Sequence, residues 1–213
     1  MTLVRAVGGA LVLGALLFAP IRAQAAPIVI SGNAQACFGV DCTNFSEWAS
    51  TTIGGATLNY LSGPGSDFWG VTEDDVLAIN GSAGSFGTLS VNTSAKTFVN
   101  TAFALLLTFS SPDALTATFD AAIRGTVTTN IATGGLYVTF DPSVITLPFI
   151  NQATGQPGTM TVYANNISLS SGGSAALTGF IETETVPEPA TLMLLGVGFT
   201  GLVARRRKLL GRV

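Results

Sequence analysis

The chain contains no histidine, and this absence excludes several classes of enzyme. Ser-His-Asp triads and Cys-His pairs both use an imidazole as general base, so neither mechanism is open to this sequence. Only two cysteines are present, which rules out a zinc site built from thiolates and imidazoles. No glycine-rich phosphate loop stands between a strand and a helix, so nucleotide binding has no support. We therefore expect a protein that is not an enzyme and needs no cofactor.

Charged residues are also scarce, at 10% of the chain against roughly 25% in soluble domains. Between Ala26 and Pro189 only Lys96 and Arg124 are positive, and we expect both to be isolated surface charges. All 12 acidic residues fall in that same segment, whose net charge is therefore −10. An acidic surface repels phosphate backbones, so we expect no binding to nucleic acid.

Long stretches with helical periodicity are missing from residues 26–185. These residues instead alternate between apolar and polar side chains, with Gly, Pro, Asn and Ser clusters between the alternating runs. In Gly135–Pro142, for example, Leu136, Val138 and Phe140 share one face. The pattern predicts roughly nine to eleven strands. An antiparallel β-sandwich, Greek-key or jelly-roll-like, is the natural arrangement, and a sheet closed on itself is the main alternative.

The first 25 residues predict a secretory signal peptide. Arg5 is followed by a short apolar run, and Ala23 and Ala25 form an A-x-A cleavage site. The mature chain then begins at Ala26. An uncleaved N-terminal anchor is the alternative, but the apolar run is short and a small-residue site follows it directly.

Export also accounts for the two cysteines, Cys37 and Cys42. In an oxidising compartment we expect them to form a disulfide that closes a small loop. By loop entropy, such a bridge stabilises the fold by about 2 kcal/mol.

Four aromatic residues are candidates for a sugar-stacking platform: Trp48 and Trp69, with Tyr60 and Phe68. Tryptophan in a β-sandwich is more commonly part of the core, so we expect burial.

A cluster of acids offers oxygen ligands for calcium. Glu73, Asp74 and Asp75 follow one another, with Asp67 upstream. The spacing is not that of an EF-hand, so a surface loop is the favoured interpretation and calcium the alternative.

The C-terminal stretch VPEPATLMLLGVGFTGLVARRRKLL combines three features. Pro187 and Pro189 hold the chain extended, with Glu188 exposed between them. Residues 190–204 carry no charge, and as a helix they span about 22 Å, short of the roughly 30 Å hydrocarbon core. The basic tail 205–212 fixes its end in the cytoplasm, which leaves the acidic domain outside.

This arrangement resembles the PEP-CTERM sorting signal of Gram-negative bacteria, over residues 186–213. The resemblance implies that an exosortase, an integral-membrane enzyme, recognises the Pro-Glu-Pro region and cuts near it. The implied sorting motif is Val186, Pro187, Glu188 and Pro189. The implied basic stop signal is Arg205, Arg206, Arg207 and Lys208.

The resemblance also implies a route and a place of work. The protein is exported through the inner membrane, anchored there transiently, and then passed to the cell surface or to a matrix of exopolysaccharide, as in a biofilm. The favoured hypothesis is therefore a non-enzymatic structural or adhesive protein. The alternative is a carbohydrate-binding module assisted by calcium. An enzyme with two carboxylates in one cleft is the weakest hypothesis, because the scattered acids single out no pair.

Overall fold

The computed structural model describes residues 27–62, 67–72, 76–79, 85–130 and 132–185, and these residues form strands, turns and loops only. The predicted all-β class is confirmed. Among the described residues, no helix is long and apolar enough to cross a membrane. The predicted signal peptide (1–25) and the predicted helix (190–204) lie outside them.

The described chain forms 14 strands, more than the nine to eleven expected. They are β1 (Val29–Phe38), β2 (Trp48–Ile53), β3 (Ala56–Leu61), β4 (Asp67–Val71), β5 (Val76–Ile79), β6 (Thr88–Thr93), β7 (Thr97–Ser111), β8 (Leu115–Val127), β9 (Gly135–Phe140), β10 (Val144–Ile150), β11 (Pro157–Ala164), β12 (Ile167–Ser170), β13 (Ser174–Ala176) and β14 (Gly179–Thr185).

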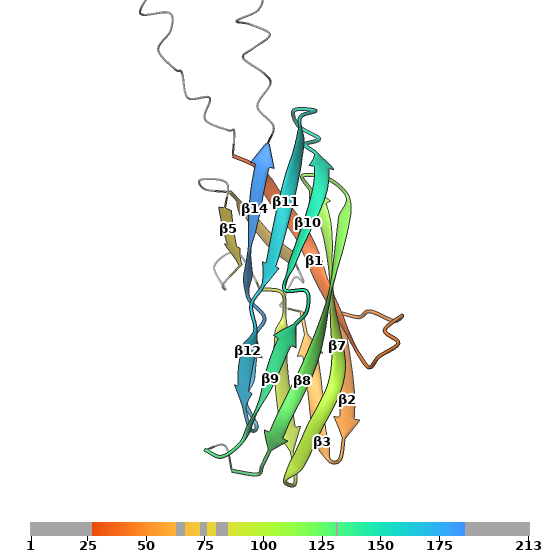
Figure 1. Cartoon of the computed structure of the whole chain (residues 1–213), viewed down its shortest axis with the longest axis vertical. Helices are drawn as coiled ribbons and strands as arrows, with labels where there is room; N and C mark the ends of the chain where they lie inside the picture. The colour runs from red at the N-terminus through yellow and green to blue at the C-terminus, as the bar shows by residue number, and fades with distance from the viewer. Residues whose placement is uncertain (1–26, 63–66, 73–75, 80–84, 131, 186–213) are drawn as a thin grey trace, which may run out of the picture.

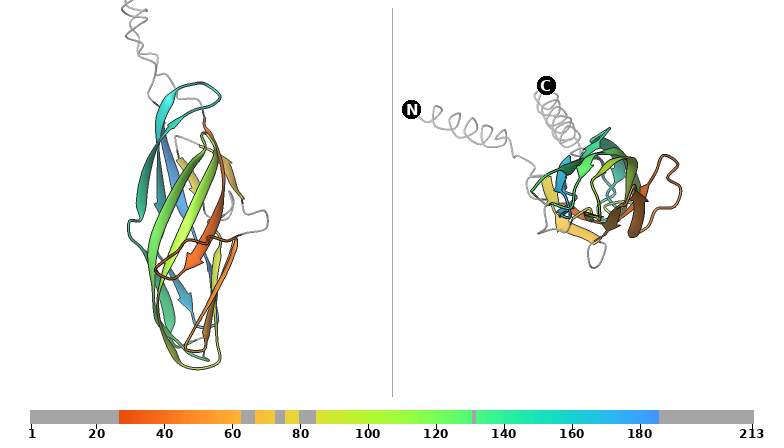
Figure 2. Two further views of the ribbon diagram at one scale, coloured as in Figure 1. Left: turned by 90° about the vertical axis from the view of Figure 1, so that its right-hand side faces the viewer. Right: turned by 90° about the horizontal axis from the view of Figure 1, so that it is seen from below.

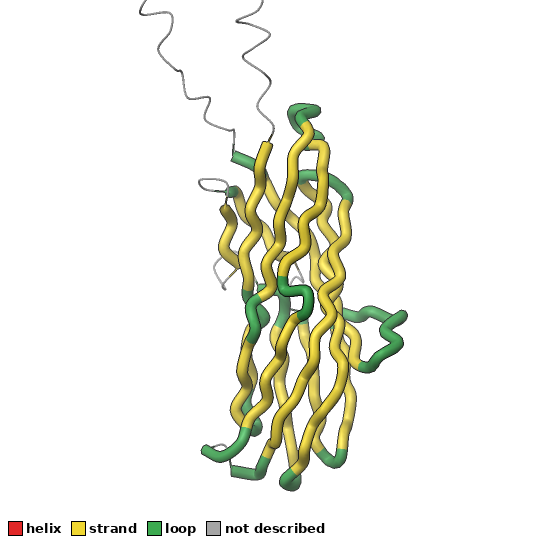
Figure 3. Tube along the Cα trace, in the orientation of Figure 1, coloured by secondary structure: helices red, strands yellow, loops and turns green. Residues whose placement is uncertain are grey.

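The strands build three antiparallel sheets. A six-stranded sheet has the order β12-β9-β8-β7-β1-β4, and the two four-stranded sheets have the orders β10-β11-β14-β5 and β13-β6-β3-β2. The six-stranded sheet runs the length of the molecule, because β7 and β8 are 15 and 13 residues long. One four-stranded sheet covers it at each end (Figures 1 and 3). The antiparallel sandwich predicted from the alternation is thus confirmed, with one of its two layers split.

The split layer contributes to the number of strands. The chain passes from one half of the molecule to the other between β9 and β10, between β11 and β12, and between β13 and β14 (Figure 1). At each pass the connecting residues leave the strand ladder, so one strand ends and another begins.

One continuous core fills the space between the layers. In β7 the alternation places Phe103, Leu105, Leu107 and Phe109 inside, each with at most 1% of its surface exposed. Phe68 packs edge-on against Phe109, with ring centroids 5.3 Å apart. Aromatic rings prefer such tilted contacts, because the positive edge of one ring meets the negative face of the other.

The start of β1 and the end of β14 lie at the same end of the elongated domain, called here the terminal end (Figures 1 and 2). The β2–β3, β6–β7 and β8–β9 turns lie at the opposite end, called the hairpin end. The loop 39–47, between β1 and β2, projects from the side (Figure 2). It carries the predicted disulfide, which is confirmed: Cys37 and Cys42 are bonded, with Cα atoms 5.6 Å apart.

Candidate functional site

Both tryptophans are on the surface, so the expectation that they belong to the core is wrong. Trp48 is 77% exposed in β2 and Trp69 is 64% exposed in β4. Among the described strands, each of the two is the edge of its sheet, with a paired neighbour on one side only. Tyr60 and Phe68 are buried, at 2% and 0% exposure, and therefore cannot belong to a surface platform.

A hollow of about 450 Å³ lies beside Trp69 on the outer face of the six-stranded sheet. Its lining comes from three adjacent strands, β4, β1 and β7. The lining residues are Ser31, Gly32, Asn33, Trp69, Thr108 and Ser110. All six are uncharged, and five of the six side chains end in a hydroxyl, an amide or an indole.

A break in strand pairing shapes this hollow. Ser31 pairs with Ser111 but Gly32 pairs with Phe109, so Ser110 is an extra residue in β7. Such a bulge bends the strand and re-aims the side chain of the extra residue. The Ser110 hydroxyl lies 2.9 Å from the Ser31 hydroxyl, on the side of the sheet that carries Trp69.

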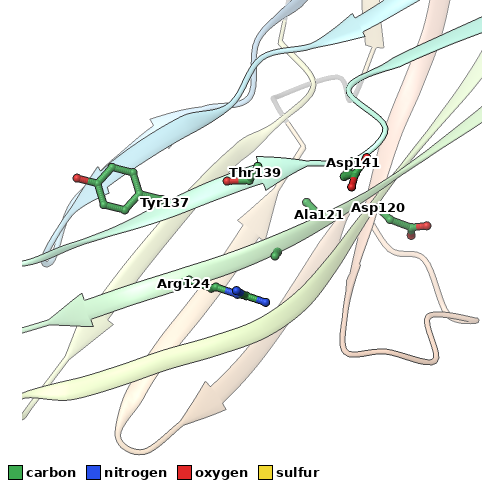
Figure 4. A pocket seen from close by; sticks show the side chains of 7 residues that line it. Asp120, Ala121, Arg124, Tyr137, Thr139 and Asp141 are labelled. Carbon is green, nitrogen blue, oxygen red and sulfur yellow. The ribbon is translucent and has the colours of Figure 1, made fainter.

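A second hollow, of about 430 Å³, lies on β8 and β9 of the same sheet. Arg124 and Tyr137 are partners across the two strands, and Tyr137 is 67% exposed. Figure 4 shows Asp120 and Asp141 near each other at one end of this hollow, with Tyr137 at the other. Tyr137 also lines a neighbouring hollow of about 560 Å³, toward β12. This surface differs from the Trp69 hollow, because it carries charges of both signs.

The described residues do not include the side chains proposed as calcium ligands. Glu73, Asp74 and Asp75 lie outside the described residues, as does the side chain of Asp67. In the part of the chain that is described, no group of three His, Cys, Asp or Glu side chains is placed to hold a metal ion. Calcium binding stays a prediction.

Two carboxylates of the terminal half have defined partners. Asp113 accepts hydrogen bonds from the Ile150 and Ala114 amides and from the Gln152 side chain, and these bonds hold its pKa below the ordinary value. Glu182 in β14 accepts a hydrogen bond from the Tyr163 hydroxyl at 3.0 Å, which raises the pKa of that phenol. The Tyr163 ring stacks on Phe180, with centroids 3.9 Å apart.

The last described strand leads directly into the predicted sorting segment. β14 ends at Thr185, whose partner is Gly158 in β11. Val186 follows, and Pro187 to Pro189 come next in the chain. One residue, Val186, therefore separates the end of the paired strand from the first proline.

Residues 185–208 match the family model described as the PEP-CTERM protein-sorting motif. The C-terminal segment is a PEP-CTERM sorting motif. The match extends over the Pro-Glu-Pro residues and the basic cluster that ends at Lys208. No curated protein and no solved structure matches the chain.

The PEP-CTERM motif indicates that this chain is an exported protein that an exosortase sorts and processes. It also implies export and transient anchoring in the membrane before processing. The roles of individual residues in the motif, and the cleavage site after Ala25, stay predictions.

Sequence reasoning did not single out Ser31, Asn33, Ser110 or Tyr137. For Tyr137 a signal was present, because the alternation around it puts an aromatic ring at an outward position. For the other three there was none, because they come together only through the pairing of β1 with β7.

Proposed function

We propose that this protein is a non-enzymatic structural or adhesive component of the cell surface or extracellular matrix, where it contacts exopolysaccharide. The observation that carries this proposal is the junction of the two parts of the chain. A PEP-CTERM sorting motif follows directly on an elongated β domain whose outer faces are rich in hydroxyl and amide groups.

Those outer faces include cross-strand pairs of polar side chains. Ser50 donates to Asn59 at 2.9 Å between β2 and β3, and the hydroxyls of Thr146 and Thr161 lie 3.1 Å apart between β10 and β11. Hydroxyl groups both donate and accept hydrogen bonds. A surface of this kind suits a hydroxylated polymer, and supports exopolysaccharide as the contact.

Fractionation of the producing bacterium tests the proposal. We expect the wild-type protein in the surface or matrix fraction, and released into the medium in a strain that makes no exopolysaccharide. The double variant Pro187→Ala/Glu188→Ala should accumulate at the inner membrane as a precursor, because the exosortase would no longer recognise it. This variant controls for release that does not depend on sorting.

Immunoblots of the inner-membrane, surface and medium fractions give the readout. Equal retention with and without exopolysaccharide would contradict the matrix role while leaving the sorting itself intact. Processing of the double variant at the wild-type rate would contradict the assignment of Pro187 and Glu188.

A carbohydrate-binding module is the second candidate, favoured by the exposure of Trp48 and Trp69. An exposed indole offers an apolar face to the C–H groups of a sugar and an N–H to its hydroxyls. Assistance by calcium through Asp67 and Glu73–Asp75 belongs to this candidate, and loss of polysaccharide binding in a chelator would support it.

A further inference from the structure

We propose that the hollow beside Trp69 is a binding subsite for one sugar ring of a neutral polysaccharide. This inference rests on the proposed contact with exopolysaccharide, and it adds where that contact is made and with which class of polymer.

The indole of Trp69 supplies the stacking surface. The side chain is 64% exposed, on the face of β4 opposite to the fully buried ring of Phe68. Phe68 is held by tilted ring contacts to Phe86 and Phe109, at 5.6 and 5.3 Å, which anchor this part of β4 to the core. A ligand that covers the indole therefore has no backbone to order at this position, which lowers the cost of binding.

Polar groups converge on the same hollow. Ser110 lies at the bulge in β7, and its hydroxyl lies 2.9 Å from the Ser31 hydroxyl. Ser110 also lies within hydrogen-bond distance of the Ser31 carbonyl, at 3.3 Å. Both hydroxyls line the same hollow as the exposed indole of Trp69.

Asn33 provides an acceptor that lacks a donor. Its Oδ1 atom is buried and has no hydrogen-bond partner, although Asn33 lines the hollow. Leaving a buried acceptor unpaired costs free energy. A sugar hydroxyl is a donor of the right kind.

Charge selects among polysaccharides. No residue that lines this hollow carries a charge. The surrounding domain is acidic, with a net charge of −10 between Ala26 and Pro189, and it repels uronic-acid polymers over a distance of about 10 Å. The geometry therefore points to a neutral polymer.

Two other exposed aromatics serve as matched controls. Trp48 has a similar exposure but lines none of the hollows described above. Tyr137 lines a hollow, but that one contains Arg124, Asp120 and Asp141. If exposure alone or a hollow alone were sufficient for binding a sugar ring, Trp48 or Tyr137 would contribute to polysaccharide binding as Trp69 does.

The experiment measures binding of the exported protein, purified from its host in mild detergent, by affinity electrophoresis and titration. The probes are three neutral polymers (hydroxyethylcellulose, dextran and galactomannan) and the acidic polymer alginate. We expect binding to at least one neutral polymer and none to alginate. Trp69→Ala should weaken binding about tenfold, which corresponds to about 1.4 kcal/mol for the lost aromatic contact. Trp69→Phe should retain part of it.

A spectroscopic readout separates binding from folding. The chain has two tryptophans, so Trp48→Phe leaves Trp69 as the only indole, and its emission should shift when the polymer binds. Trp48→Ala and Tyr137→Ala should bind as the wild type does. Thermal unfolding of each variant checks that the fold persists.

Three results would overturn the inference: no binding to any neutral polymer, binding to alginate instead, or equal binding by the wild type and Trp69→Ala. None of them would remove the proposed matrix role. If Trp69→Ala is still retained in the matrix fraction, the protein contacts exopolysaccharide through another surface.

Discussion

At the scale of single residues, Asp113 joins two turns at the terminal end of the domain. It lies between β7 and β8, and accepts from Ile150 at 3.1 Å and from Gln152 at 3.1 Å, next to the β10–β11 turn. It also accepts from the Ala114 amide at 2.8 Å. These hydrogen bonds favour the ionised carboxylate and lower its pKa in the folded state. The stability that Asp113 contributes by joining the two turns therefore depends on pH.

We predict that Asp113→Ala lowers the melting temperature near neutral pH. A depressed folded pKa contributes stability above the ordinary value of 3.8, and that contribution disappears as the pH falls through the lower folded pKa. The difference in melting temperature between the wild type and Asp113→Ala should therefore become smaller in acid. Melting curves from neutral pH to pH ~2 measure it. Asp41→Ala, at an exposed position in the disulfide loop, is the control, and a difference that is constant with pH would contradict this role of Asp113.

At the scale of elements, the segment before β6 connects the two four-stranded sheets. Phe86 and Gly87 exchange backbone hydrogen bonds with Leu177, at 2.9 and 2.8 Å, just before β14. The buried Tyr60 hydroxyl donates to the Phe86 carbonyl at 2.9 Å. Gly87 has a φ of +101°, and a Cβ there would stand 2.4 Å from the Tyr60 ring. The connection therefore requires glycine.

We expect Gly87→Ala to lower the free energy of unfolding by roughly 1–3 kcal/mol beyond the cost of the backbone strain itself. Gly155→Ala is the matched control, because Gly155 also has a positive φ, +71°, but a Cβ there meets nothing within 4 Å. Chemical denaturation of both variants gives the comparison. Equal losses of stability in the two variants would show that the contact with Tyr60 contributes nothing to the destabilisation.

Alternation predicted the all-β class and the inward face of β9, because period two follows directly from strand geometry. It did not predict the exposure of Trp69. Phe68 and Trp69 are neighbours in β4, so one ring must face the core and the other the solvent, and both are apolar enough for the core. The register with β1 decides between them, since Trp69 pairs with Ser31 and Phe68 with Gly32. That pairing spans some 38 residues and is not visible in either segment alone.

At the scale of the whole molecule, the sorting motif follows directly in the chain on the last described strand, β14. β14 is paired on both sides, with β11 and β5, and contributes the buried Ile181 and Thr183 to the interior. All of its pairs end at Thr185, before the Pro-Glu-Pro residues. Cutting the chain at or beyond the motif therefore removes no strand.

We predict that the processed protein and the unprocessed Pro187→Ala/Glu188→Ala precursor unfold at the same temperature in detergent. A chain that stops at Thr178, and so lacks β14, should not reach the folded state, because β11 and β5 lose their common neighbour. Mass spectrometry identifies each C-terminus, and near-ultraviolet circular dichroism follows unfolding. A processed form that melts well below the precursor would show that the tail supports the fold.

The position of β14 also bears on mechanical load. Its seven residue pairs with β11 and four with β5 lie along the strand, which points toward the terminal end. When tension acts on the chain beyond Thr185 along that direction, it shears all of these pairs at once instead of peeling them one after another. A surface protein held by this end in flowing liquid would thus bear the force across a whole strand interface, and the strand nearest the attachment is flanked on both sides.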